Sequence, residues 1–317
     1  MSKESRELLC YEEFEEKVTD YVRENLIEGI SVEITEVTKN NGVVLKGLSL
    51  KESDSSISPT VYLERYYCGY ENGQTIEEIG DEIIDVYHKG NLGEFFDVSD
   101  FLDFEKAKSR IVYKLVNYEK NKVLLKQIPH KPFLDMAVVY YYLLENEHID
   151  NATILIYNNH LETWKITEKE LDDLAKKNTP KLLKEDLRSI TDVLYQILKN
   201  RSESAAEQFL EEEKDAMSDP IMYVLSNRNK IFGAAAILYK GVLKKFSEEV
   251  KKDLYILPSS VHEVILIPKD DTMEWEKLQE MVKEVNSTQV EDVEVLSDSV
   301  YCYQRSNDAL LPAWAVA

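Results

Sequence analysis

Glycine, cysteine and basic charge are all scarce in this chain of 317 residues. Its 10 glycines leave little room for loops that cradle a nucleotide, and no phosphate-loop signature, Gly-x-Gly-x-x-Gly fingerprint or His-Glu-x-x-His motif occurs. The three cysteines, Cys10, Cys68 and Cys302, lie too far apart in the chain to suggest zinc ligands. We therefore expect no cofactor and no metal site. Three unpaired thiols fit a reducing compartment.

Positive charge is outnumbered, because 38 Lys and Arg residues stand against 60 Asp and Glu residues, which gives a formal net charge of -22. Such a chain repels phosphate backbones, which argues against direct binding of nucleic acid. The acidity is typical of a charge that keeps a protein soluble. The alternative is an acidic DNA mimic, whose carboxylates lie in two rows at duplex-like spacing and occupy a nucleic-acid-binding protein.

Long apolar runs are also absent from the sequence. The longest, Met136 to Leu144, is far too short to span a bilayer. The first seven residues are polar and lack the apolar core of a signal peptide. The sequence therefore predicts a cytoplasmic protein with no membrane partner.

Apolar residues make up 44% of the chain, which is enough for a substantial core. Tyrosine dominates the aromatic residues, with 19 tyrosines against nine phenylalanines. Tyrosine suits half-buried positions at which its hydroxyl reaches water or a partner. This composition is compatible with an interaction surface.

The first 200 residues predict an α+β region of helices and two hairpins. Asn41-Gly42 between apolar runs is a strong hairpin signal, and Thr167 with Glu170 forms a capping box that predicts a helix from Thr167. Apolar side chains at helical spacing predict helices over residues 8–26, 61–70, 76–88 and 101–117. Strands are expected over residues 32–35, 43–45, 133–144 and 152–157, with a loop over 51–59 and a turn over 145–151.

An acidic stretch over residues 201–219 predicts a linker or an exposed helix that divides the chain into an N-terminal region, 1–200, and a C-terminal unit, 220–317. Strands are expected there over 221–225, 254–257, 261–267 and 300–303, with helices over 234–250 and from Asp271 to Val285. This order, β-α-β-β-α-β, is the ferredoxin-like arrangement. In that arrangement the third strand is central, between the first and the second.

Three segments of the chain resemble one uncharacterised family: Pro59–Glu64, Leu115–Asn121 and Asp253–Glu263. The Leu-Pro-Ser-Ser-x-His-Glu stretch that begins at Leu257 is the most distinctive of these. On this resemblance, which runs over nearly the whole length, the chain is identified as a member of domain of unknown function 5688, found in gut Clostridia and their relatives. The resemblance implies an anaerobic Gram-positive host and carries no established activity or catalytic residue.

The same distinctive stretch contains candidate catalytic residues. A serine nucleophile needs a base within hydrogen-bond reach, and Ser260 and His262 lie two positions apart. On a strand over 261–267, neighbouring side chains point to opposite faces, so His262 and Glu263 are not expected to pair. No Gly-x-Ser-x-Gly elbow occurs in the chain. The alternative is a structural turn that carries a buried histidine near a strand end.

The expected topology also brings two loops to one edge of the C-terminal sheet. The first and second strands run parallel, so the loops that leave their carboxyl ends share that edge. A helix beginning near Gly233 points its N-terminus there, where free N–H groups favour anions. The alternative interpretation is that Gly233 allows the helix to pack closely on the sheet. The candidate binding residues for a small anion or a partner's carboxylate are Asn227, Arg228, Asn229, Lys230, Ser259 and Ser260.

Three hypotheses for function follow from the sequence. The first is a non-catalytic binding or regulatory protein that acts through protein contacts, since no catalytic signature is complete. The second is an enzyme of unknown, hydrolase-like reaction that uses Ser260 and His262 alongside Arg228. The third is the acidic DNA mimic.

Overall fold

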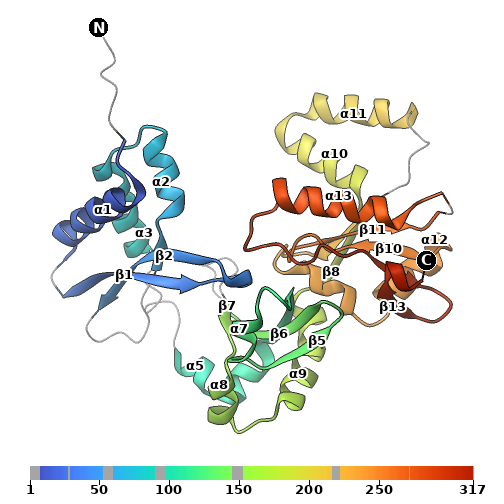
Figure 1. The fold of residues 1–317 in the computed structure, drawn as a ribbon, viewed down its shortest axis with the longest axis horizontal. Coiled ribbons are helices and arrows are strands. Elements are labelled where there is room, and N and C mark those ends of the chain that lie inside the picture. Colours follow the sequence, from blue (N-terminus) through green and yellow to red (C-terminus); the bar gives the residue numbers. More distant parts are fainter. Residues whose placement is uncertain are drawn as a thin grey trace. The chain divides into compact units, whose positions relative to one another are not determined.

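The computed structural model describes residues 8–27, 29–52, 60–89, 98–144, 153–215, 222–270 and 272–316. The chain forms two compact units (Figure 1). The first comprises Met1–Phe101 and Glu145–Asp150, and the second comprises Leu102–Leu144 and Asn151–Ala317. Helices combine with antiparallel sheets, so the expected α+β class is confirmed. None of the helices described has the length and apolar character needed to cross a bilayer.

The first unit packs helices against a three-stranded antiparallel sheet of order β1-β2-β3. The predicted hairpin is confirmed, and its turn places Asn41 (φ 61°) and Gly42 (φ 71°) in the left-handed region that these residues tolerate. Residues 61 and 62 belong to a strand and not to the expected helix. The elements are α1 (Tyr11–Asn25), β1 (Ile30–Thr38), η1 (Asn40–Gly42), β2 (Val44–Glu52), β3 (Thr60–Tyr62), α2 (Glu64–Glu71) and α3 (Ile76–Lys89), with α5 (Val98–Leu102) after them.

One continuous core holds this first unit together. Phe14 of α1, Leu48 of β2 and Ile79 of α3 are fully buried in it. Two tyrosines of α2, Tyr66 and Tyr70, are buried in the same core. Most of the loop expected over 51–59 lies outside the described residues.

The second unit contains two sheets, of which the smaller has four strands around a central β6. The capping box at the start of α9 is confirmed, since Thr167 Oγ1 accepts a hydrogen bond from the Glu170 amide at 3.2 Å. The elements are α6 (Phe104–Ala107), η2 (Lys108–Arg110), β4 (Ile111–Asn117), α7 (Lys122–Leu125), β5 (His130–Phe133), β6 (Met136–Leu143), β7 (Thr153–Leu155), α8 (Asn158–Trp164) and α9 (Glu168–Leu182).

The helix predicted over 101–117 is wrong beyond residue 110. Ile111–Asn117 forms β4, which pairs antiparallel with β6 along its whole length. Five of its seven residues are buried, because the strand is covered on both faces. A strand with apolar side chains on both faces also has apolar residues at helical spacing, and for this reason the sequence pattern predicted a helix here. The strands expected over 133–144 and 152–157 correspond to β6 and the shorter β7, but Phe133 belongs to β5, which pairs with β6. The turn expected over 145–151 lies outside the described residues.

The larger sheet has six strands in the order β13-β12-β10-β11-β9-β8. Around it lie α10 and α11, which occupies most of the acidic stretch, and α12 and α13 (Figure 1). The bounds are β8 (Glu185–Ser189), α10 (Ile190–Arg201), α11 (Glu203–Asp215), β9 (Tyr223–Asn227), η3 (Gly233–Leu238), α12 (Val242–Val250), β10 (Leu254–Leu257), β11 (Val264–Pro268), α13 (Trp275–Thr288), β12 (Tyr301–Gln304), β13 (Ala309–Pro312) and η4 (Ala313–Ala315).

The succession β-α-β-β-α-β is present from β9 to β12, and β11 lies between β9 and β10 as expected. The ferredoxin-like order fails at the fourth strand, because β12 pairs with β10 and not with β9. The place beside β9 is taken by β8, which precedes the acidic stretch in the chain. Residues on both sides of that stretch therefore share one sheet.

The predicted bounds of two helices and one strand in this part of the chain need correction. The helix expected over 234–250 is broken into η3 and α12 by Gly241, whose φ of 80° is left-handed. The last helix begins at Trp275 after the N-cap residue Glu274, while Asp271 lies outside the described residues. The strand expected from Val261 begins at Val264, so the alternation argued for His262 and Glu263 does not apply.

Candidate functional site

The loop after β9 is built around the buried side chain of Asn227. Its Oδ1 accepts hydrogen bonds from the amides of Asn229 and Ile231, at 3.1 and 3.3 Å, and its Nδ2 donates to the Ile231 carbonyl at 2.7 Å. A buried amide whose oxygen and nitrogen both bond to its own loop locks that loop's shape. Asn227 thus holds the backbone while the side chains of Arg228 and Lys230 stay exposed.

The structure brings this loop against the segment that follows β10, as the topology predicted. Ser226 Oγ donates to the His262 carbonyl at 2.7 Å, and the Ala234 amide donates to the Val261 carbonyl at 3.2 Å. Gly233 lies at the centre of this junction. A Cβ there would meet Ser226 Oγ at 2.2 Å and the His262 carbonyl oxygen at 2.5 Å, so the close approach requires glycine.

His262 joins the parts of the junction through its ring. Nδ1 lies 3.2 Å from the Lys230 carbonyl oxygen and 3.4 Å from the Phe232 amide, and Nε2 lies 3.3 Å from a Glu294 carboxylate oxygen. The ring also stacks on Phe232, with centroids 5.6 Å apart. Both ring nitrogens therefore face partners that hold the junction together.

Ser260 contacts His262 through the backbone. Its Oγ accepts a hydrogen bond from the His262 amide at 3.1 Å, and the residue forms an isolated β-bridge with Val295. A nucleophile and its base need a hydrogen bond from the hydroxyl to the imidazole. Among the described residues, the Ser260 hydroxyl makes no hydrogen bond to the His262 ring.

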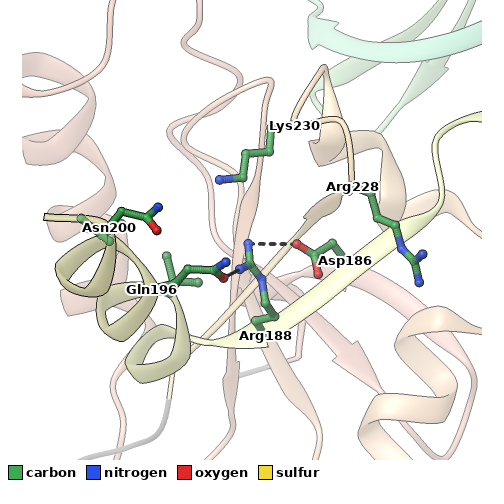
Figure 2. Close-up of a pocket in the computed structure, with 8 residues that line it drawn as sticks. Asp186, Arg188, Gln196, Asn200, Arg228 and Lys230 are labelled. Atoms are coloured by element: carbon green, nitrogen blue, oxygen red, sulfur yellow. Dashed lines mark hydrogen bonds and ion pairs between the residues drawn. The ribbon is translucent and has the colours of Figure 1, made fainter. Parts of the chain in front are cut away.

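A pocket of about 470 Å³ opens beside this junction, between β8, α10 and the loop after β9 (Figure 2). Three of its lining residues are cationic and one is acidic. Figure 2 shows Arg188 at the centre, Lys230 extending its amino group toward the pocket and Arg228 turned away from Arg188. The lining residues are Asp186, Arg188, Val193, Gln196, Ile197, Asn200, Arg228 and Lys230. We call this the cationic pocket.

Arg188 is fixed in place by two partners. Its Nη2 lies 2.9 Å from Asp186 Oδ2, and its Nη1 donates to Gln196 Oε1 at 2.9 Å. Asp186 therefore balances one of the three cations. Arg228 and Lys230 form no ion pair with any residue that the structure describes, so the pocket keeps an excess of positive charge in a strongly acidic chain.

Two of the six candidate binding residues line the cationic pocket, namely Arg228 and Lys230. Asn229 and Ser259 are not among its lining residues, and the Ser259 carbonyl accepts a hydrogen bond from the Leu296 amide at 2.9 Å. Ser260 and Asn227 support the loops from inside.

Sequence reasoning missed the wall formed by β8 and α10. The signals are present: Asp186 and Arg188 are two apart on a strand and therefore share a face, while the four lining residues of α10 recur at three and four. These spacings indicate a site only once β8 is known to pair with β9, because that pairing brings the residues beside Arg228.

Thiols and other metal-ligating groups do not gather in the described part of the molecule. Cys10 and Cys68 are exposed, Cys302 is buried, and all three are free. Among the described residues, no three His, Cys, Asp or Glu side chains lie close enough to hold a metal ion.

The chain was compared with family models, curated proteins and solved structures. The model of a family of unknown function (DUF5688) matches residues 11–305. No curated protein and no solved structure matches the chain significantly.

Proposed function

The chain belongs to this family of unknown function, and we propose that it is a non-catalytic binding protein whose cationic pocket takes a carboxylate side chain of a partner protein. The observation that carries the proposal is the pocket itself, whose lining holds three cationic residues, Arg188, Arg228 and Lys230, and one carboxylate, Asp186. Charge-assisted hydrogen bonds from arginine to a carboxylate are among the strongest polar contacts that proteins make.

The protein's overall negative charge does not prevent this recognition. At physiological ionic strength the Debye length is about 8 Å, so acidic groups farther away are largely screened from a ligand in the pocket. The immediate neighbours then decide the local potential, and these are mainly cationic. Arg188 is also held rigidly by Asp186 and Gln196, so little side-chain entropy is lost when an anion binds.

The surroundings of the pocket favour a peptide over a free inorganic anion. Val193 and Ile197 line one wall, and Ile197 and its neighbour Leu194 on α10 are 46% and 41% exposed. Exposed apolar side chains beside cations match a partner segment that alternates acidic and apolar residues. A volume of about 470 Å³ also exceeds what one phosphate or acetate would fill.

The test is calorimetric titration with a synthetic peptide in which Asp and Glu alternate with Leu and Phe. We expect saturable binding that weakens with added salt, while the same peptide with Asn and Gln in place of the acids does not bind. Equal binding of the two peptides would contradict the proposal. Sodium acetate and phosphate serve as competitors, and displacement of the peptide by either at equimolar concentration would show that the pocket is a site for free anions.

Matched variants locate the binding. Arg228→Gln with Lys230→Gln removes two exposed cations, each contributing about 0.5–1 kcal/mol, so the affinity should fall roughly fivefold to thirtyfold. Lys244→Gln with Lys245→Gln removes the same charge from exposed positions on α12 that do not line the pocket. The second pair should leave the affinity unchanged, and equal losses in the two pairs would place the binding elsewhere.

A further inference from the structure

A second pocket of about 460 Å³ lies in the same unit, between the smaller sheet, α9 and the residues that end η3. Its walls are apolar: Phe133 of β5, Val138 of β6, Pro180 of α9 and Leu238 of η3 all line it. Tyr113 and Tyr239 complete the lining, with their rings at 80° and centroids 6.3 Å apart. An apolar pocket of this size with a few polar groups has the usual character of a small-molecule site.

Lysines gather along this pocket in excess of carboxylates. Asp172 is the one acidic lining residue, and its Oδ2 lies 2.5 Å from Lys176 Nζ and 3.9 Å from Lys131 Nζ. Its Oδ1 accepts a hydrogen bond from the Tyr140 hydroxyl at 3.1 Å. Lys240 also lines the pocket and forms no ion pair within the described residues. One carboxylate thus faces three ammonium groups.

Tyr113 supplies a hydrogen-bond donor without a partner. The residue is only 3% exposed, and its hydroxyl makes no hydrogen bond to any residue that the structure describes. The hydroxyl of Tyr239, in contrast, donates to the Leu183 carbonyl at 2.7 Å. Burial, with smaller contributions from Tyr239 and the charge of Asp172, raises the pKa of Tyr113, so the phenol stays protonated and can donate. An unpartnered hydroxyl on a largely buried residue gains most from a ligand that accepts its hydrogen bond.

We propose that this pocket binds a small amphipathic carboxylate, whose aromatic or branched apolar body lies among Phe133, Val138 and Leu238 while its head group meets Lys240, Lys176 and the Tyr113 hydroxyl. The negative charge of the ligand offsets the excess of lysine charge that Asp172 alone does not neutralise. The site shares no residue with the cationic pocket, so the two proposals stand or fall separately.

The experiment uses three probes with one apolar body and different heads: phenylbutyrate, phenylbutanol and phenylbutylamine. In calorimetric titration of the full chain, the acid should bind tightest, the alcohol about tenfold weaker and the amine weakest. The reason is that a charge-assisted hydrogen bond contributes more binding free energy than a neutral one, by an amount that corresponds to about tenfold in affinity. An alcohol or amine that binds as tightly as the acid would overturn the proposal. So would the absence of phenylbutyrate binding up to roughly millimolar concentration, the weak limit of specific recognition.

Variants then assign the binding to the pocket. Lys240→Gln should weaken phenylbutyrate about tenfold and leave phenylbutanol unchanged, while Lys244→Gln, an exposed lysine outside the pocket, should change neither. Tyr113→Phe removes only the hydroxyl and should weaken phenylbutyrate roughly fivefold. Circular dichroism checks that each variant is folded. Folded variants with unchanged affinity would overturn the assignment, and unchanged phenylbutyrate binding by the Arg228→Gln, Lys230→Gln protein would show that the two sites are independent.

Discussion

Asp135 connects the two sheets of the second unit, and its substitution gives the sharpest test of how that unit is held together. The residue lies in the turn between β5 and β6. Its Oδ2 accepts hydrogen bonds from Ser297 Oγ at 2.7 Å and Ser299 Oγ at 2.9 Å, and its Oδ1 accepts one from the Tyr301 hydroxyl. Three hydroxyl groups, two from the segment before β12 and one from β12 itself, therefore converge on one carboxylate in the β5–β6 turn.

The cost of Asp135→Ala follows from what is left behind. Ser297 and Tyr301 are almost fully buried, at 0% and 1% exposure, and a buried polar group without a partner costs about 1–3 kcal/mol. Their two hydroxyls lie 3.2 Å apart and compensate each other in part. We therefore expect a loss of about 3 kcal/mol in the free energy of unfolding, equivalent to a fall of about 6 to 12 °C in Tm for a unit of this size.

The assay is urea unfolding followed by tryptophan fluorescence. The chain's three tryptophans, Trp164, Trp275 and Trp314, all belong to the second unit, so the signal reports on that unit. Asp135→Asn keeps one acceptor oxygen and should cost about half as much. Glu263→Ala, at an exposed position, should stay within about 0.5 kcal/mol of the parent. A loss below about 1 kcal/mol for Asp135→Ala would refute the role given to this carboxylate.

Three further substitutions test packing and hydrogen bonding elsewhere in the second unit. Tyr141→Phe removes a buried hydroxyl that has no hydrogen-bond partner among the described residues, and it should raise the free energy of unfolding by up to about 1 kcal/mol. A clear loss of stability in urea unfolding would contradict this expectation. Gly233→Ala forces a Cβ against backbone and should cost about 2 kcal/mol or more, and an unchanged urea midpoint would count against it. Burial, and then the hydrogen bond to Asp308, raises the pKa of Tyr303 to about 12, above the value near 10 of an unfolded tyrosine. Its contribution is complete below about pH 10 and is lost as the pH rises toward 12, so Tyr303→Phe should flatten the fall in stability over that range, and an unaltered slope would disprove the link.

Elements with strong local signals could be predicted from the sequence. Asn41-Gly42 produced a hairpin because both residues tolerate left-handed backbone, and Thr167 with Glu170 capped a helix because the partners are local. The meeting of the loop after β9 with the segment around Ser260 was also foreseen, since it depends only on β9 and β10 running parallel.

Features decided by distant partners could not be predicted. β4 resembled a helix because burial on both faces removes the alternation that marks a strand. The cationic pocket needs β8 beside β9, a pairing across more than thirty residues that leaves no local pattern. Tyr113 and Lys240 come together only when the two sheets of the second unit pack.

Arginine side chains offer the most direct test of the central claim, that the cationic pocket binds a partner's carboxylate. The Nε–H resonances of nitrogen-labelled protein are followed during titration with the acidic peptide and assigned by Arg→Lys variants. The account predicts that the signals of Arg188 and Arg228 move together and saturate, while that of Arg305, which does not line the pocket, stays in place. Movement of Arg305 with Arg188 and Arg228 unchanged would contradict it.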